Sequence, residues 1–492
     1  MATHDSLINE SSLRVHPEGV ALSLQLPWYR SLWLSSVNTI ELSIDGQPVP
    51  KDRLVFALNG SRFEIDEIGE HWDKLWYLQD HALLIAKLDS PAAVGDTHEI
   101  DVVADMRIPY MQIKPGLYVP NKVHMVRTLT ATDAPPVEAP PATTSTASAR
   151  ASSESSEAEP FKLGLTLYSA TAELAAGQYD LDSLLARVAE LGIGPGIEIV
   201  ASQTLRTYPE VSPEFVRNWR GTFDKYGFEA SSFGANLDMG RRRDRDMTLE
   251  EEFDFTELLL RGAKALDFPL VRIQSAKPEL LRRILPVAEK LDLKLGYEIH
   301  APMGPNSPEI QKVRDLYAEI DSPLLGFVAD FSSTMHSMSP TLIRAMRKMG
   351  LDDEAVEQMQ SLWVTDAPMH ERSGAFIEYL NGRGIDPATL GPLARLAFNM
   401  HGHIDPHEWS DIMPQILHVH AKFYDIDEDG REPAIDYETI VSEFVKGGFR
   451  GYMSSEWEGH AFADLGEVDP LVLVQKQHAL IRRAMRAELA LA

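Results

Sequence analysis

The spacing of apolar residues changes at about residue 130, and the two patterns predict two kinds of domain. Before this point, apolar and polar residues alternate with period two, for example in segments 22–26 and 100–108. Such alternation is typical of strands with one buried face. No helix-length amphipathic pattern interrupts the region. We therefore expect residues 1–130 to form a small all-β domain, an antiparallel sandwich.

Two dipeptides that favour tight turns, Asp45-Gly46 and Asn59-Gly60, fall between strand-like runs of this region. Residues of these types tolerate the positive φ that two-residue hairpins require. Asn59 also begins a match to an N-glycosylation acceptor. The first residues, Met-Ala-Thr-His-Asp, lack the basic and apolar segments of a signal peptide, so the turn is the favoured interpretation.

The segment 131–160 has a composition of its own, in which Pro, Ala, Ser, Thr and Glu replace almost all large apolar residues. Such a segment cannot bury enough apolar surface to order itself, so we interpret it as a flexible linker. A chain of 492 residues is also too long for one hydrophobic core, which predicts at least two domains.

Residues 161–492 show short apolar runs that alternate with amphipathic segments, the pattern of parallel β/α units. Eight runs are strand candidates, the number that closes a (β/α)8 TIM barrel, so we predict an α/β fold of this type. A doubly wound open sheet is disfavoured by the count and by the lack of a GxGxxG turn. The stretch 332–414 is longer than a crossover needs, and we expect an insertion that forms a lid or an oligomer contact. The candidates are 163–168, 196–200, 228–235, 270–274, 294–300, 325–331, 416–423 and 451–457.

Polar residues occupy the carboxyl ends of four consecutive predicted strands, where the reacting groups of a TIM barrel lie. They are Glu298, Asp330, His420 and Glu456. Taken singly, each could be a solvated or ion-paired side chain. Together, three carboxylates at one barrel mouth would repel one another, which a bound divalent cation would relieve. Oxygen ligands with one imidazole favour Mn²⁺, with Mg²⁺, Co²⁺ or Zn²⁺ as alternatives.

Residues two apart on a strand share a face, and this periodicity adds further candidates. His300 points the same way as Glu298 and is a candidate base, with a solvent-facing histidine as the alternative. Four residues are candidates for binding substrate oxygens, with ion pairing inside the barrel as an equal explanation for the first three: Lys422, Arg272, Gln274 and His418. Three residues of adjoining loops are expected at the surface: His336, Glu458 and His460.

The composition of the chain excludes several classes of partner and of chemistry. The net charge of -28 excludes nucleic acid and anionic membrane surfaces as expected partners, because both would be repelled. The chain has no cysteine, so disulfides, thiolate nucleophiles and Cys-ligated zinc are ruled out. No apolar run approaches the length of a membrane span, and we expect a cytoplasmic protein.

The order Glu, Asp, His, Glu on strands five to eight resembles the xylose isomerase-like TIM barrels, in which four such side chains hold a divalent metal. The resemblance implies Glu298, Asp330, His420 and Glu456 as ligands. Segments 26–32, 44–50 and 107–111 resemble the β-subunit of bacterial C-glycoside deglycosidases. The barrel, with its His-Ala-Lys-Phe-Tyr run from residue 420, resembles their α-subunit.

Two features depart from these families. The two deglycosidase subunits are usually separate chains, whereas here they are fused with the β-part first. The Asp-x-x-His pattern of epimerase relatives is missing, because Ser333 occupies the histidine place. This second departure weakens an epimerase interpretation.

The resemblance implies a metal-dependent lyase whose small-molecule glycoside substrate has been oxidised to a ketone at sugar C3 by a separate oxidoreductase. Removal of the C2 proton would precede elimination of the aglycone, with cleavage of a C–C or C–O bond. His300 is the expected base, with Glu298 or Glu456 as alternatives. A ketose 3-epimerase or sugar isomerase and a non-catalytic sugar-binding protein are the alternative functions. We expect the protein to form a homo-oligomer.

Overall fold

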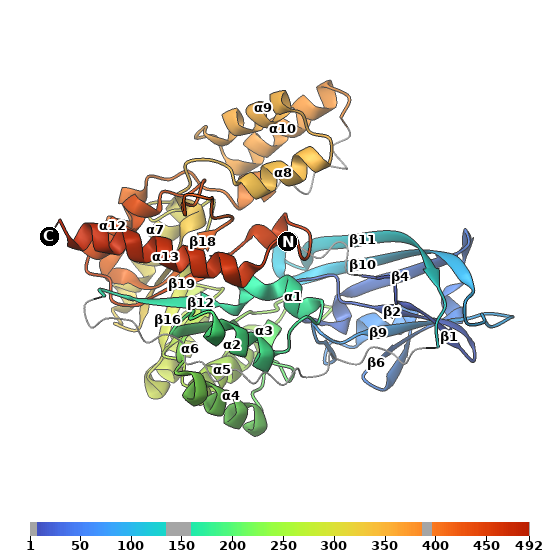
Figure 1. The fold of residues 1–492 in the computed structure, drawn as a ribbon. Helices are drawn as coiled ribbons and strands as arrows, with labels where there is room; N and C mark the ends of the chain where they lie inside the picture. Colours follow the sequence, from blue (N-terminus) through green and yellow to red (C-terminus); the bar gives the residue numbers. More distant parts are fainter. Residues whose placement is uncertain (1–6, 134–158, 386–395, 492) are drawn as a thin grey trace.

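The computed structural model describes residues 7–133, 159–385 and 396–491, and residues 7–133, here called the β-domain, are rich in antiparallel strands (Figure 1). The strands are β1 (Leu13–His16), β2 (Gly19–Leu24), β3 (Leu32–Trp33), β4 (Val37–Ile44), β5 (Gln47–Pro48), β6 (Leu54–Leu58), β7 (Ser61–Glu64), β8 (Leu75–Trp76), β9 (Ala82–Lys87), β10 (Thr97–Lys114) and β11 (Leu117–Thr130). One sheet has the order β1-β2-β9-β6-β7 and another the order β11-β10-β4-β5, while β3 pairs with β8.

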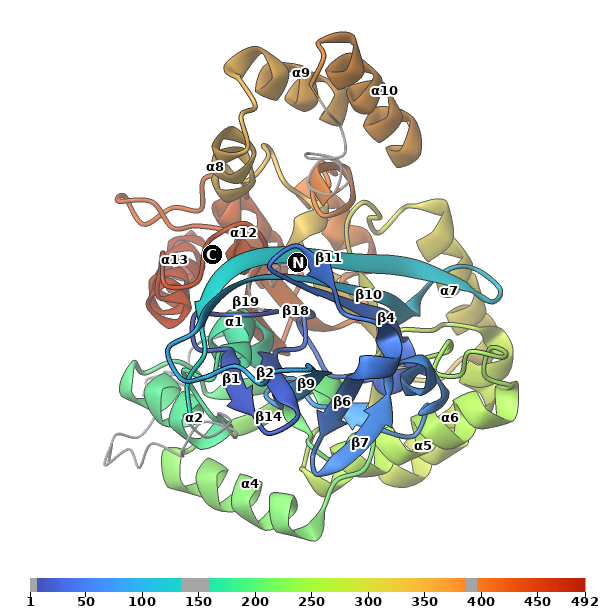
Figure 2. The same ribbon diagram turned by 90° about the vertical axis from the view of Figure 1, so that its right-hand side faces the viewer.

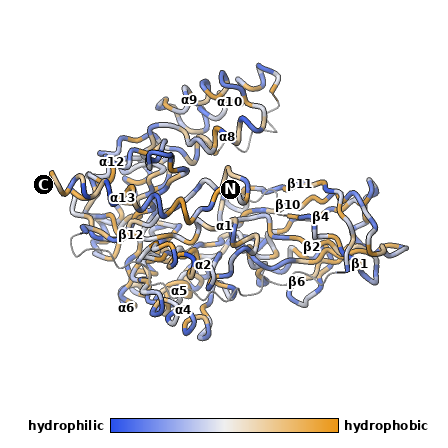
Figure 3. The backbone as a smooth tube through the Cα atoms, in the orientation of Figure 1, coloured by the Kyte–Doolittle hydropathy of each residue, from blue (hydrophilic) through white to orange (hydrophobic). Residues whose placement is uncertain are grey.

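The two larger sheets of the β-domain share one hydrophobic core. Leu84 of the first sheet and Val102 of the second belong to the same buried cluster. Along β10, buried residues alternate with less buried ones. Hydrophobic and hydrophilic residues are mixed throughout the β-domain in Figure 3. The sheets therefore form a sandwich, as the period-two pattern predicts.

Both predicted two-residue turns are present. Asp45 and Gly46 connect β4 to β5, while Asn59 and Gly60 connect β6 to β7. All four residues have positive φ, between 49° and 78°. The local sequence therefore sets the register of these hairpins.

The second half of the chain contains a closed barrel of parallel strands in sequence order, which confirms the predicted TIM barrel. Among the described residues, eight strands form it, and each lies within two residues of its predicted bounds. They are β12 (Lys162–Thr166), β13 (Gly196–Val200), β14 (Glu229–Gly234), β15 (Leu270–Ile273), β16 (Lys294–Ile299), β17 (Leu325–Asp330), β18 (Ile416–Phe423) and β19 (Tyr452–Trp457).

Helices cover the outside of this barrel (Figure 1). The helix that follows Asp180 begins with a capping box, in which the Asp180 side chain and Ser183 satisfy each other's backbone N–H. The helices on the outside are α2 (Leu181–Glu190), α4 (Pro213–Tyr226), α5 (Leu249–Ala265), α6 (Pro278–Leu291), α7 (Pro308–Ile320), α12 (Tyr437–Lys446) and α13 (Pro470–Leu489), whereas the short helices α1 (Thr171–Ala175) and α3 (Ala201–Thr204) contact the β-domain. Among the described residues, no helix combines the length and apolarity needed to cross a membrane.

In the described part of the stretch between β17 and β18, helices project from the barrel in Figure 1, among them α8 (Pro340–Lys348), α9 (Asp353–Trp363) and α10 (Met369–Gly382). Residues 386–395 of the expected insertion lie outside the described part of the chain, as do residues 134–158 of the expected linker. A lid or oligomer role for the insertion stays a prediction.

The β-domain lies against the carboxyl-terminal end of the barrel (Figures 1 and 2). Its partners in the barrel follow the ends of β12, β13 and β14. Ser31 N–H donates to the carbonyl oxygen of Ser202, just after β13, over 3.1 Å. Gln79 Nε2 donates to the carbonyl oxygen of Leu174, after β12, over 2.9 Å. The β-domain thus contacts the end of the barrel at which catalytic residues lie in TIM-barrel enzymes.

Candidate metal centre and active site

The carboxyl-terminal halves of β16 to β19 bring four predicted residues together: Glu298, Asp330, His420 and Glu456. One potential ligand atom from each lies within 4.8 Å of the others, a spacing that could hold a metal ion. The register explains the convergence, because Asp330 pairs with His420 and Lys422 pairs with Glu456 across adjacent strands. Paired positions of parallel strands project to the same face, here the inside of the barrel.

Two oxygens of this group lack hydrogen bonds. Asp330 Oδ2 and Glu456 Oε2 are buried and accept no hydrogen bond from the described residues. Lys422 Nζ lies 3.3 and 3.0 Å from them, close enough for charge attraction. His420 Nδ1 lies 2.6 Å from Glu298 Oε1 and 3.3 Å from Glu456 Oε2. Unsatisfied carboxylate oxygens beside an imidazole nitrogen fit a divalent cation such as Mn²⁺.

A second group that could hold a metal shares His420 and adds Glu198 and His418. Glu198, on β13, is 1% exposed and accepts hydrogen bonds from His418 Nε2 over 2.8 Å and His420 Nε2 over 2.9 Å. Burial opposes its ionisation, but the two imidazoles outweigh this effect and lower the pKa of Glu198.

The hydrogen bonds favour the first group as the metal site. Both oxygens of Glu198 are already bonded, whereas Asp330 and Glu456 each keep an unbonded oxygen. A carboxylate that holds the far nitrogen of a ligating histidine is a common partner of metal sites. The buried position of His418 against Glu198 favours this supporting arrangement over the predicted contact with substrate oxygens.

Glu198 is absent from the sequence-based assignment. Its signal is a single carboxylate inside the otherwise apolar strand Gly-Ile-Glu-Ile-Val. A buried carboxylate of this kind needs hydrogen-bond partners, but no residue close to Glu198 in the sequence suggests which groups they are. Its partners, His418 and His420, are distant in the sequence and approach Glu198 only in the folded barrel.

The surface placement expected for two loop residues is wrong. Glu458 is 2% exposed and His460 is 1% exposed. The Glu458 N–H donates to the carbonyl oxygen of Phe423, which holds the start of this loop against the end of β18. Glu458 Oε2 accepts a hydrogen bond from Lys422 Nζ over 2.8 Å. Burial opposes ionisation of Glu458, but Lys422 lowers its pKa to about 2. His336 is exposed, as expected.

The side chains of the site leave an excess of negative charge. Carboxylates from five residues meet two permanent cations, Arg272, 3.7 Å from Glu298, and Lys422. Burial raises the pKa of Glu456 to about 7, because His420 and Lys422 offset only part of the burial penalty. Burial also opposes ionisation of Glu298, but Arg272 and His420 keep its pKa well below the usual value. A divalent cation would supply the missing positive charge.

His300 faces the edge of this group. Its Nδ1 lies 2.7 Å from the carbonyl oxygen of Ala301, which can only accept, so Nδ1 carries the proton of the neutral ring. The other nitrogen, Nε2, lies 3.9 Å from Asp330 Oδ2. The side chain is 31% exposed.

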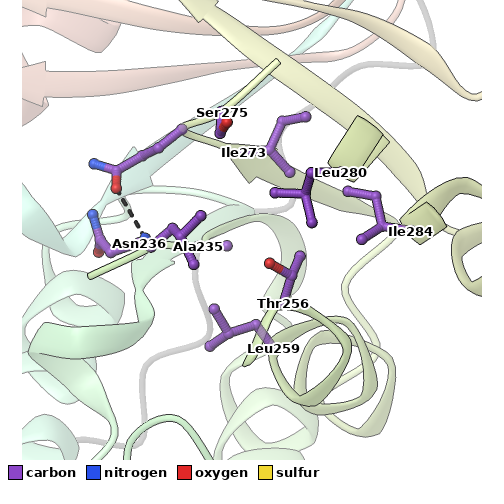
Figure 4. A pocket seen from close by; sticks show the side chains of 10 residues that line it. Ala235, Asn236, Thr256, Leu259, Ile273, Ser275, Leu280 and Ile284 are labelled. Carbon is purple, nitrogen blue, oxygen red and sulfur yellow. Dashed lines mark hydrogen bonds between the residues drawn. The ribbon is translucent and has the colours of Figure 1, made fainter. Parts of the chain in front are cut away.

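The Gln274 side chain lies outside the acidic group. Its Oε1 accepts a hydrogen bond from Leu237 N–H over 3.0 Å. It lines a small pocket between the barrel wall and helices α5 and α6, together with Asn236, Thr256 and Leu280 (Figure 4). No member of the acidic group lines this pocket. The predicted contact of Gln274 with the substrate therefore finds no support in its position.

Comparison with known sequences matches the two parts of the chain to two families. Residues 3–110 match the C-glycoside deglycosidase beta subunit family. Residues 185–486 match the family described as xylose isomerase-like TIM barrel.

Curated relatives match the same two parts. A C-glycoside deglycosidase alpha subunit from Arthrobacter globiformis is 60% identical over 324 residues, which cover 66% of this chain and 92% of the relative. A 3'-dehydrocarminate deglycosidase alpha subunit from a Microbacterium species is 36% identical, over 65% of this chain and 94% of the relative. A C-glycoside deglycosidase beta subunit from Arthrobacter globiformis is 42% identical, over 26% of this chain and 96% of the relative.

Proposed function

The chain belongs to the C-glycoside deglycosidase family, with sequences of both subunits in one polypeptide, and we propose that it cleaves 3-oxo-glucosides by eliminating the aglycone. The observation that carries this proposal is the convergence of Glu298, Asp330, His420 and Glu456 beside the partly exposed side chain of His300. The name of the 3'-dehydrocarminate relative supports a substrate oxidised at the sugar.

The four convergent residues would hold the metal, with Mn²⁺ as the favoured ion. When bound, a divalent cation supplies a Lewis acid to the substrate oxygens beside C2, which makes the C2 proton more acidic. Glu198 holds the Nε2 proton of His420, so Nδ1, which is hydrogen-bonded to Glu298 in this structure, is the nitrogen that would bind the metal.

His300 is the proposed base. Its Nδ1 proton is held by the Ala301 carbonyl, so Nε2 is the nitrogen that accepts the C2 proton. The electron pair of the C2–H bond then forms a C1=C2 bond while the bond from C1 to the aglycone breaks. The aglycone takes up a proton, so no oxidant or reductant is consumed in this step. Glu298 and Glu456 are the alternative bases.

Arg272 and Lys422 are proposed to hold substrate oxygens and to limit repulsion among the carboxylates. Arg272 keeps a buried Nε–H that has no hydrogen-bond acceptor among the described residues, a donor that a sugar oxygen would satisfy. Lys422 lies within 3.3 Å of three carboxylates, so its main contribution is to hold those groups in place.

Product analysis tests the proposal against a ketose epimerase or isomerase. Purified protein with Mn²⁺ is incubated with a 3-oxo-C-glucoside, a 3-oxo-O-glucoside and free ketoses. We expect release of the aglycone from at least one 3-oxo-glucoside and no change of the ketoses. Conversion of the ketoses alone would contradict the proposal, and sugar binding without any conversion would favour a non-catalytic binding protein.

A further inference from the structure

We propose that Tyr29 of the β-domain is a substrate-binding residue of the barrel's active site and donates a hydrogen bond to an oxygen atom of the bound glycoside. The inference rests on the proposed function and extends it, because it makes the β-domain a part of the site. Three independent observations support it: the anchoring of the segment, the position of the ring and the hydrogen bonds of the hydroxyl group.

The segment that carries Tyr29 is fixed to the barrel. Next to it, Arg30 forms an ion pair of 2.5 Å with Asp238 of the loop after β14, and both side chains are 0% exposed. Trp33 Nε1 donates to the same carboxylate over 2.7 Å. Gln203 Nε2, after β13, donates to the carbonyl oxygen of Tyr29 over 3.1 Å. The backbone at Tyr29 is therefore held at the barrel mouth.

The Tyr29 ring reaches the residues that surround the acidic group. It meets the ring of Tyr168 edge to face, with 5.4 Å between centroids. The Tyr168 hydroxyl donates to Glu458 over 2.8 Å, and Glu458 in turn binds Lys422. One aromatic ring thus separates Tyr29 from the Lys422 ammonium.

The hydroxyl of Tyr29 has a proton to donate. Trp28 Nε1, which can only donate, binds the Tyr110 hydroxyl oxygen over 3.2 Å. The Tyr110 hydroxyl then donates to the Tyr29 oxygen over 2.9 Å. No described residue accepts the Tyr29 proton in turn. Hydrogen bonds in such a chain strengthen one another, so the last hydroxyl is a good donor to a neutral oxygen.

A substitution that removes only the hydroxyl tests the inference. Tyr29→Phe keeps the contact with the Tyr168 ring. We expect kcat/KM for a 3-oxo-aryl-C-glucoside to fall about tenfold or more, as for loss of one buried hydrogen bond to substrate. The dissociation constant of this glucoside for metal-depleted protein, measured by calorimetry, should rise. The Mn²⁺ affinity should stay as in the wild type, and the melting temperature should fall only slightly, because the Tyr110 hydroxyl loses its acceptor.

Tyr118→Phe is the matched control, because the Tyr118 hydroxyl also links the β-domain to the barrel, through Asp246 over 2.7 Å, but does not face the acidic group. It should retain the wild-type kcat/KM. Wild-type kinetics and binding in Tyr29→Phe, or an equal loss in Tyr118→Phe, would overturn the inference alone. Failure of the wild-type protein to act on any 3-oxo-glucoside would instead refute the proposed function, and this inference with it.

Discussion

At the scale of single residues, His420 connects the two halves of the candidate site. Its Nδ1 faces Glu298 and Glu456, while its Nε2 is bonded to Glu198. Burial opposes a charge on the ring, but these carboxylates raise the pKa of His420. The imidazole is thus oriented from both sides, which favours one fixed direction for a ligand nitrogen.

The proposed base gives the first prediction. His300→Gln should lower kcat for a 3-oxo-glucoside by about 10²- to 10⁴-fold, because it removes the proton acceptor at Nε2. The Mn²⁺ affinity should change little, since His300 is not among the four proposed ligands. Steady-state kinetics and metal titration check both parts. Unchanged kcat would move the role of base to Glu298 or Glu456.

Glu198 gives the second prediction. Glu198→Gln should weaken Mn²⁺ binding by about 10- to 100-fold, because the amide no longer holds the Nε2 proton of His420 as a carboxylate does. Competition with a metal-binding dye measures the change. Glu173→Gln is the matched control, because it makes the same substitution at a buried carboxylate outside the site. An unaltered affinity in Glu198→Gln would exclude an orienting role, and complete loss would make Glu198 a ligand.

At the scale of elements, strands were easier to predict than the loops that join them. The apolar runs of the barrel set both the strand bounds and, through period two, which side chains point inward. This is why Glu298, Asp330, His420 and Glu456 could be grouped from the sequence. Loop residues have no such period, so the sequence did not predict the burial of Glu458.

Helix α1 contains a buried carboxylate that the sequence does not predict. The helix lies between the barrel and the β-domain, where its Leu174 carbonyl accepts a hydrogen bond from Gln79. Glu173 is consequently 5% exposed, and its Oε2 has no partner among the described residues. Burial raises the pKa of Glu173 from 4.5 to about 7.

This shift predicts a pH-dependent stability. Between about pH 4.5 and 7 the native state retains a proton that the unfolded chain releases, so the contribution of Glu173 to stability falls as pH rises through this range. Glu173→Gln should therefore stabilise the protein at pH 8 by up to about 3 kcal/mol and have little effect at pH 4. Thermal melts at both pH values measure this. A greater gain at pH 4 would contradict it.

At the scale of the whole molecule, the β-domain and the barrel share a polar and aromatic interface. Sequence patterns identified both architectures, but they could not place one against the other, because the contacts join residues far apart in the chain. Arg30 and Asp238 are 208 positions apart. The contribution of Tyr29 to the site could be inferred only from this placement.

The buried ion pair gives the prediction at this scale. Arg30→Met should lower the free energy of unfolding by about 3–5 kcal/mol, because it leaves the Asp238 carboxylate buried with fewer partners. Differential scanning calorimetry would record a lower melting temperature. The double variant Arg30→Met/Asp238→Asn should recover part of the loss. Equal destabilisation of the single and double variants would show that the uncompensated charge is not the cause.

The most direct test of the account is the position of the metal. Crystals grown with Mn²⁺ would be measured on both sides of the manganese absorption edge. The account predicts one anomalous peak within bonding distance of Glu298, Asp330, His420 and Glu456. A peak between Glu198 and His418 instead, or no peak in protein that cleaves 3-oxo-glucosides, would contradict it.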